Sequence, residues 1–257
     1  MMLPLLLPVL AFGQLPTRYT PFGHSHNDYA GKQPFTLAYA LGFGSIEADV
    51  FLVRDTLWVG HVAQDVEQRR SLEDLYLLPL EQRVKENNGQ AYPKKSASLQ
   101  LMIDIKTTAG PTLDALIREL RRHPALIHAI GLTWTISGAR PPDSSYDKYP
   151  DFIHFDGDIT RPYDKGPLAR IPMMSADLVR LLAPRPLKAA PAEGPLDKAT
   201  TDSLKALIRD AHQQGKKVRF WDAPDHPAAW KQLLDLGVDY INTDKVEELS
   251  RYPEHAP

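Results

Sequence analysis

The feature that most constrains the fold is a regular alternation, along the whole chain, of short apolar runs with segments of helical periodicity. This alternation is typical of a parallel sheet covered by the helices that connect its strands. Eight strands are the number that closes such a sheet into a barrel. The sequence therefore predicts a single (β/α)8 TIM barrel, with strands at 20–26, 45–53, 99–107, 131–137, 152–159, 171–175, 216–222 and 238–243.

The connecting segments agree with this fold. A short extra strand is expected at Leu57–His61, after the second barrel strand. Segments rich in Pro and polar residues, at 139–150 and 183–195, are expected to be loops over one rim. The chain of 257 residues has the length of one such barrel. Helices are predicted at 34–41, 71–87, 111–122, 200–214, 227–236 and 245–251.

The N-terminus differs in kind from the rest of the chain. Met1–Phe12 is an apolar run that is too short to span a bilayer, and Ala11-Phe12-Gly13 has the small-x-small pattern of a cleavage site. We expect residues 1–13 to be a signal peptide and residues 14–257 to form the barrel domain. The chain has no cysteine, which is compatible with a secreted or periplasmic protein.

Composition narrows the choice of partners. The net charge of −2 argues against nucleic acid and against an anionic membrane surface as partners. No later segment has the roughly 20 apolar residues that a membrane span requires, so we expect no stable membrane insertion. We expect a monomer that acts on a small-molecule or lipid-derived substrate.

Two histidines mark the end of the first strand. His24 and His26 are two residues apart, so on a strand they share one face, and Asn27 follows them. Catalytic groups of a barrel collect at the C-terminal ends of the strands. We predict that His24 is catalytic and that His26 and Asn27 contact the substrate.

Three carboxylates on the next two barrel strands predict a cation site. Glu47 and Asp49 share a face, and the apolar residues between and beside them point the other way. Asp104 has the same inward position on the following strand. Carboxylates gathered inside a barrel cannot all stay ionised without a cation or strong donors. A hard divalent ion, Mg²⁺ or Ca²⁺, selects such oxygen ligands.

Further polar residues surround this predicted site. Lys106 shares a face with Asp104 and would either bind a phosphate oxygen or form a salt bridge to Asp104. His61 follows the carboxylate pair by twelve residues. Two histidines flanking a phosphodiester are what general acid–base cleavage requires, because one removes a proton from the nucleophile while the other protonates the leaving oxygen.

The last two strands add candidates for substrate binding. Arg219 would bind phosphate through its guanidinium fork, Trp221 would wall the site, and Asn242 ends the final strand. His154 and Asp156 share a face on the fifth strand and are weaker candidates. We assign no role to the remaining histidines that lie on predicted helices or in the tail, His123, His128, His212 and His255.

These motifs together resemble the phospholipase C-like phosphodiesterase superfamily, which includes glycerophosphodiester phosphodiesterases, phosphatidylinositol phospholipases C and sphingomyelinases D. The order of Gly23-His24-x-x-Asn27, Ser45–Val50, His61 and Asp104–Thr107 is most like the sphingomyelinase D arrangement. The later segments 219–221 and 237–244 are similar to the altered inheritance of mitochondria family of fungi.

The resemblance implies metal-dependent phosphodiester hydrolysis with a role in lipid metabolism. Glu47, Asp49 and Asp104 would be the metal ligands, with His24 and His61 as the acid–base pair. In this superfamily a neighbouring hydroxyl of the substrate often attacks phosphorus first, which gives a cyclic phosphate. The chain lacks the His-Arg-Gly opening of typical glycerophosphodiesterases, so the resemblance does not name its substrate.

Two alternatives remain at this point. His24-x-His26 also opens zinc-dependent amidohydrolases, in which His154 and Asp244 would be further ligands. That class leaves Glu47 and Asp49 without a task. A barrel that binds a phosphorylated ligand without turnover is the other alternative.

Overall fold

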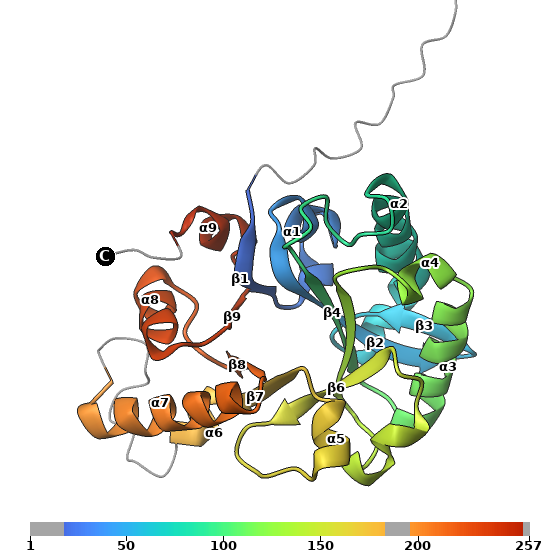
Figure 1. The fold of residues 1–257 in the computed structure, drawn as a ribbon. Helices are drawn as coiled ribbons and strands as arrows, with labels where there is room; N and C mark the ends of the chain where they lie inside the picture. Colours follow the sequence, from blue (N-terminus) through green and yellow to red (C-terminus); the bar gives the residue numbers. More distant parts are fainter. Residues whose placement is uncertain (1–17, 183–195, 254–257) are drawn as a thin grey trace, which may run out of the picture.

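The computed structural model describes residues 18–182 and 196–253, within which eight parallel strands close into a barrel surrounded by helices (Figure 1). Each strand is hydrogen-bonded to the next, and β9 returns to β1. The predicted fold and all eight predicted strands are confirmed. They are β1 (Thr20–Ser25), β2 (Phe43–Val53), β4 (Leu99–Ile105), β5 (Leu132–Gly138), β6 (Ile153–Asp158), β7 (Met173–Asp177), β8 (Lys217–Trp221) and β9 (Tyr240–Thr243).

The short strand predicted after β2 is also present. It is β3 (Thr56–Val59), which pairs antiparallel with the end of β2. Arg54 and Asp55 connect the two strands, and both have positive φ, 50° and 63°. A two-residue loop with positive φ at both positions is the hairpin turn that matches strand twist. The hairpin therefore returns the chain alongside the end of β2, where Val59 pairs with Val50, and His61 follows two residues later.

All six predicted helices have counterparts, but one of them is divided. The segment 71–87 forms a π-helix, Glu73–Leu77, followed by α2 (Leu78–Glu86). Pro79 has no N–H to donate to the preceding turn, so a regular α-helix cannot run through this point. The other five are α1 (Thr36–Ala40), α3 (Ala109–Arg121), α7 (Lys198–Gln213), α8 (Pro227–Leu236) and α9 (Val246–Arg251).

Several shorter helices were not predicted. They span three to six residues, which is too short for a hydrophobic period to emerge in a sequence. One of them, Asp143–Lys148, lies within the segment predicted to be a loop. The set comprises α4 (Pro124–Ile127), α5 (Lys165–Ala169), α6 (Leu178–Leu182) and the 3₁₀ helices Asp28–Ala30, Ala63–Gln68 and Asp143–Lys148.

Along each strand, side chains point alternately outward into the hydrophobic core and inward into the barrel, where the site lies. Outward residues such as Ile46, Ala48 and Ile103 are completely buried between the strands and the helices. Each such side chain contributes about 1.5–3 kcal/mol by leaving water. Inside the barrel a small apolar cluster is formed by Met102, Met173 and Tyr240. Polar inward residues follow it toward the C-terminal ends of the strands.

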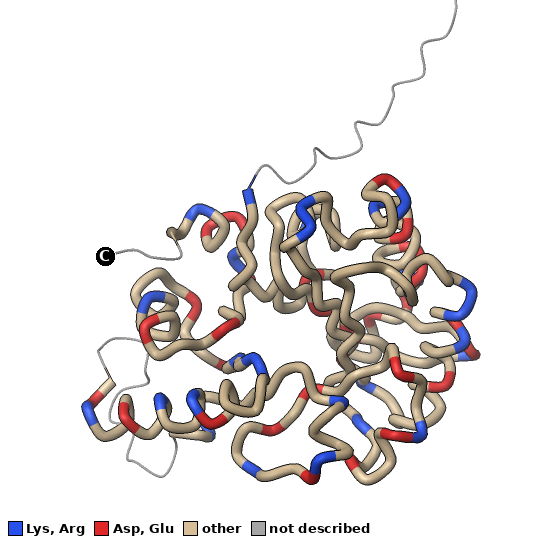
Figure 2. Tube along the Cα trace, in the orientation of Figure 1, with Lys and Arg blue, Asp and Glu red and all other residues tan. Residues whose placement is uncertain are grey.

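The outer surface carries both signs of charge. Figure 2 shows acidic and basic positions interspersed along the outer helices. Within the described residues, no helix is long and apolar enough to cross a membrane. The predicted signal peptide at 1–13 and the predicted loop at 183–195 lie outside the described residues.

Candidate functional site

Three carboxylates converge at the mouth of the barrel. Asp49 of β2 is in register with Asp104 of β4, and Glu47 lies one inward position earlier on β2. Each residue offers a carboxylate oxygen within 4.8 Å of the others. Asp49 and Glu47 are only 1% and 4% exposed. The structure thus brings together the three residues that the sequence suggested as cation ligands, here called the carboxylate triad.

Room for this triad depends on a glycine. Gly138, at the end of β5, has a positive φ of 66°. A Cβ atom there would lie 2.4 Å from Oδ1 of Asp104 and 2.5 Å from the backbone oxygen of Ile105. No side chain fits at that distance, so glycine is required for Asp104 to take its place in the triad.

Lys106 provides a positive charge beside the triad. Its Nζ lies 2.9 Å from Oδ2 of Asp49 and 2.8 Å from Oδ1 of Asp104. Burial and the charges of Glu47 and Asp104 raise the pKa of Asp49, and Lys106 opposes that rise. Burial lowers the pKa of Lys106, but the two carboxylates outweigh it and raise the value. The salt bridge to Asp104 that the sequence allowed is therefore present and also includes Asp49.

This ammonium group makes a testable difference to stability. In Lys106→Met the buried carboxylates lose their partner, so the free energy of unfolding should fall by about 2 kcal/mol in EDTA. This is below the roughly 3–5 kcal/mol for a fully buried pair, because the lysine side chain is 26% exposed. Added Mg²⁺ or Ca²⁺ should restore more stability to Lys106→Met than to the parent protein. Urea unfolding with and without cation measures this, and an equal response of both proteins would contradict it.

His24 is enclosed on the inner side of the site. Its Nδ1 lies 2.8 Å from Ser45 Oγ, and its Nε2 lies 3.0 Å from Glu47 Oε2. Nη1 of Arg219 donates to the same Nε2 at 2.7 Å, and the ring is completely buried. Burial and the charge of Arg219 lower the pKa of His24 to about 4, against the opposing effect of Glu47. The imidazole is therefore neutral near pH 7.

Glu47 is stabilised as an anion by the same neighbours. Burial alone would raise its pKa, but the contact with His24 and the charge of Arg219 lower it to about 2. Nε2 of a neutral His24 serves either as a donor to Glu47 or as an acceptor from Arg219, according to the tautomer. The three side chains thus form one coupled buried group.

His61 lies on the outer side of the triad. Its Nδ1 is 3.3 Å from Asp49 Oδ2 and 3.2 Å from the hydroxyl of Tyr29. The ring is 63% exposed. The backbone N–H of His61 donates to Asp65 at 2.8 Å, which fixes the loop after β3. His61 therefore contacts the triad through Nδ1, and the rest of its ring faces solvent.

Tyr29 is a member of this group that the sequence did not reveal. Its hydroxyl lies 2.7 Å from Asp49 Oδ2 and 2.6 Å from Asn27 Oδ1. Burial and the charge of Asp49 raise the pKa of Tyr29, so the hydroxyl stays a donor. Asn27 is in the left-handed region with φ 46°. Nothing in the periodicity of segment 27–30 distinguishes Tyr29 from a core tyrosine.

A cavity of about 930 Å³ opens beside the triad. Several predicted site residues line it, while His24, Asp49, His61, Asn27 and Asn242 are not among its lining residues. Trp221 stands at the rim and is 37% exposed. The predicted residues that line the cavity are His26, Glu47, Asp104, Lys106, Arg219 and Trp221.

Arg219 is one of the residues that line the cavity and is only 3% exposed. It donates to Asn242 Oδ1 at 3.1 Å and lies 3.6 Å from Glu47 and 3.8 Å from Asp156. Asn242 therefore holds Arg219 in place. It does not line the cavity, where a substrate contact was predicted. The buried guanidinium of Arg219 thus supplies positive charge to both Glu47 and Asp156.

Asp156 also lines the cavity. Ser175 Oγ donates to its Oδ2 at 2.6 Å and Ser137 Oγ at 3.3 Å, while Oδ1 has no hydrogen-bond partner. Burial raises the pKa of Asp156, and Arg219 and Arg140 oppose the rise. Sequence reasoning gave Asp156 little weight and missed both serines. Their positions near the C-terminal ends of β5 and β7 were the signal available.

The ligand set of a zinc amidohydrolase is not assembled. His26 Nδ1 pairs with Asp244 Oδ1 at 2.8 Å. Within the described part of the chain, no group of three or more potential metal ligands includes His24, His26, His154 or Asp244. His154 has a lowered pKa because of burial and Arg170, and it does not line the cavity.

Two family models match the chain. The AIM6-like phosphodiesterase domain matches residues 18–125, which include the two histidines and the carboxylate triad. The glycerophosphoryl diester phosphodiesterase family matches residues 217–247, which include Arg219 and Asn242.

Curated proteins are similar to the chain over most of its length, and one solved structure has a similar fold. The altered inheritance of mitochondria protein 6 homolog of Arthroderma benhamiae is 28% identical, over 89% of this chain and 82% of its own length. Altered inheritance of mitochondria protein 6 of Eremothecium gossypii is 27% identical, over 89% of this chain and 68% of its own. A glycerophosphodiester phosphodiesterase from Parabacteroides distasonis has a similar fold, with a TM-score of 0.52 and 15% identity over 89% of this chain and 94% of that one.

Proposed function

We propose that this chain is a member of the phospholipase C-like phosphodiesterase superfamily, similar to its altered inheritance of mitochondria branch. We further propose that it hydrolyses a small phosphodiester at the carboxylate triad. The observation that carries the proposal is the convergence of Glu47, Asp49 and Asp104 beside a polar cavity. The substrate would be a glycerophosphodiester or another phosphodiester related to a phospholipid headgroup.

The triad fits a hard divalent cation such as Mg²⁺ or Ca²⁺. All three donors are carboxylates, which are the ligands these ions select. Oδ1 of Asp49 is buried without a hydrogen-bond partner, whereas Oδ1 of Asp104 has the ammonium group of Lys106 at 2.8 Å. A buried anionic oxygen without a donor is costly, and a cation would remove that cost. When bound, the ion would neutralise charge on the phosphoryl oxygens in the transition state.

The side chains of this protein would do the remaining work. Lys106 and Arg219 both line the cavity and would attract and orient a phosphate group. His61 is held at Nδ1 by Asp49, so proton exchange with the substrate would fall to its Nε2. Asp49 would also stabilise the imidazolium when His61 carries the extra proton.

His24 would be the second acid–base group. Its Nε2 is contacted by Glu47 and Arg219, and both of these line the cavity. A substrate phosphate that draws the guanidinium of Arg219 toward itself would free Nε2 for proton transfer. One histidine would then remove a proton from the nucleophile while the other protonates the leaving oxygen.

The proposal is tested with bis(p-nitrophenyl) phosphate and a set of glycerophosphodiesters, each assayed with Mg²⁺, Ca²⁺ or EDTA. We expect turnover with one of the two ions, loss of turnover in EDTA, and loss in Asp104→Asn at any ion concentration. Phosphorus NMR of the products would distinguish a cyclic phosphate from a hydrolysed monoester. Turnover that persists in EDTA would refute the cation, and ligand binding without turnover would favour a non-catalytic barrel.

Two broader expectations accompany this function. The apolar start of the sequence and the absence of cysteine support a secreted or periplasmic protein. The charges interspersed over the outer helices (Figure 2) support a protein that acts as a monomer, because a stable interface is usually depleted of charge at its centre.

A further inference from the structure

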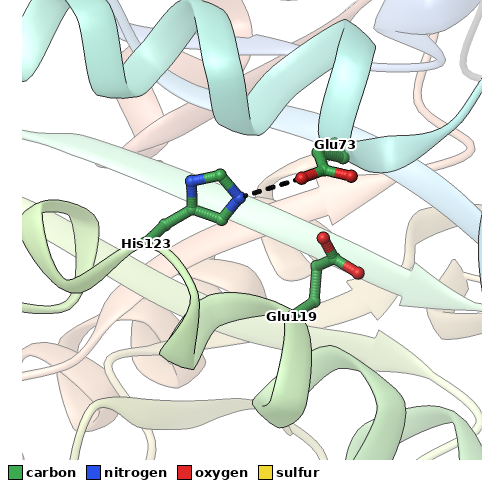
Figure 3. A group of neighbouring side chains, drawn as sticks. All are labelled: Glu73, Glu119 and His123. Carbon is green, nitrogen blue, oxygen red and sulfur yellow. Dashed lines mark ion pairs between the residues drawn. The ribbon is translucent and has the colours of Figure 1, made fainter.

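A second group of metal-ligating side chains lies on the outer helices. Glu73 belongs to the π-helix before α2, Glu119 belongs to α3, and His123 lies between α3 and α4. Each offers a ligand atom within 4.8 Å of the others (Figure 3). None of the three lines the cavity at the barrel mouth. The sequence gave no reason to connect Glu73 with His123, to which we assigned no role.

His123 is the unusual member of this group. The residue is only 5% exposed, and both ring nitrogens are buried without a hydrogen-bond partner. Figure 3 shows its ring directed at Glu73, with 3.5 Å between Nε2 and Oε1. This separation exceeds the usual 2.7–3.2 Å of a hydrogen bond. Buried polar atoms in folded proteins are almost always satisfied, so these nitrogens indicate a missing partner.

The separations suit a transition metal. Zinc bonds of about 2.0–2.2 Å at a tetrahedral angle place neighbouring ligand atoms about 3.3–3.6 Å apart. The distance from His123 to Glu73 falls in that range. Glu119 lies in the last turn of α3, and His123 follows two residues after the end of that helix. Imidazole combined with carboxylate is a donor set suited to Zn²⁺, whereas Mg²⁺ and Ca²⁺ select oxygen alone.

The opposite ring nitrogen also has the neighbour expected of a metal ligand. Nδ1 of His123 lies 3.6 Å from Oε2 of Glu81. Metal-bound histidines commonly direct their second nitrogen to a carboxylate, which fixes the ring and the tautomer. Glu81 is itself held by Lys85, 2.9 Å away. The histidine is thus flanked by carboxylates at both nitrogens.

Arg122 supplies positive charge to the two glutamates. Its guanidinium pairs with Glu119 and lies 3.5 Å from Glu73. The arginine side chain is 59% exposed, so it can leave for solvent with little loss of stability. Arg122 therefore competes with a metal ion for the glutamates and should lower the affinity of the site.

We propose that Glu73, Glu119 and His123 bind a Zn²⁺-class transition metal ion that links the turn before α2 to the end of α3. The site is structural, because it joins two outer helical segments and is separate from the cavity. It is also independent of phosphodiester hydrolysis. Removal of the metal should change stability while leaving the barrel mouth intact.

The test is a Zn²⁺ titration by calorimetry in the double variant Glu47→Gln/Asp104→Asn, which removes carboxylates of the triad. We expect one equivalent of Zn²⁺ to bind. Adding His123→Gln or Glu73→Gln should weaken binding by more than about 100-fold, and adding Glu81→Gln should weaken it by about 10–100-fold. Adding Arg122→Gln should strengthen binding. His212→Gln is the matched control and should change nothing.

Thermal unfolding gives a second readout in the unaltered protein. Zn²⁺ at a hundred times its dissociation constant should raise Tm by about 5–10 °C, and His123→Gln should lose this rise. If His123→Gln fails to fold, Glu73→Gln decides, because Glu73 is 39% exposed. Unchanged zinc affinity in Glu73→Gln would overturn the proposal. An equal affinity for Mg²⁺ in the calorimetric titration of the double variant would overturn the assigned class of metal.

Discussion

Replacing His61 with glutamine should lower the turnover of a phosphodiester by about 10²–10⁴-fold, the usual contribution of one general acid or base. Glutamine retains a polar group next to Asp49, but its amide neither gains nor loses a proton near neutral pH and cannot act as an acid or a base. The side chain of His61 is 63% exposed, so the free energy of unfolding should change by less than about 0.5 kcal/mol. Steady-state kinetics with bis(p-nitrophenyl) phosphate, together with urea unfolding, measures both quantities.

His128→Gln is the matched control for this substitution. His128 is also exposed, at the end of α4, and does not line the cavity. Its replacement should leave kcat/KM within about twofold of the parent value, in keeping with a surface change. Activity of His61→Gln close to that of His128→Gln would remove His61 from the acid–base pair. The cation test with EDTA would still stand, because it depends on the carboxylates.

Much of the barrel could be predicted because its strands alternate strictly. On β2 the apolar Ile46, Ala48 and Val50 face the helices, which sends Glu47 and Asp49 inward. The same period on β4 sends Asp104 inward. Parallel register then brings strand ends to one mouth. Convergence of the triad follows from local patterns and fold class alone.

Other parts of the site depend on contacts between distant segments. Arg219 reaches His24 across 195 residues of sequence, and Tyr29 reaches Asp49 across 20. A periodic pattern in the sequence does not indicate which distant residues will contact each other. The sequence therefore identified His24 but not its complete burial, and it identified Asn242 but not its hydrogen bond to Arg219.

The division of the segment 71–87 illustrates a second limit. Its apolar period predicts one helix, and periodicity does not report hydrogen-bond geometry. The lost N–H of Pro79 precludes a regular α-helix there, and a π-helix precedes α2. This local change contributes Glu73 to the group around His123, which explains why that group was not expected.

Replacing Arg219 with methionine should destabilise the barrel by about 3–5 kcal/mol, the usual result of removing one partner from buried ionic groups. Glu47 and Asp156 would lose the guanidinium that lies 3.6 and 3.8 Å from them. Urea unfolding measures the loss. Arg251→Met is a matched control, because Arg251 is 75% exposed and, among the residues that the structure describes, forms its ion pair with Glu247 of the same helix. That control should change stability by less than about 1 kcal/mol.

The loss should also depend on pH in a definite direction. Burial already raises the pKa of Asp156 above its usual 3.8, and Arg219 opposes this rise. Without Arg219 the pKa of Asp156 rises further, so the folded state binds a proton that the unfolded state releases. Stability of Arg219→Met should therefore fall more steeply than that of the parent as pH increases from 3.8 through the higher folded pKa.

A second substitution separates lost charge balance from lost packing. Asp156→Asn removes one of the two carboxylates that Arg219 faces and preserves the shape of the side chain. In Arg219→Met/Asp156→Asn the penalty should be smaller than in Arg219→Met alone, and its pH dependence should weaken. If the double variant is as unstable as the sum of the single variants, the two side chains are not coupled. Arg219 would then act mainly by filling space beside the cavity.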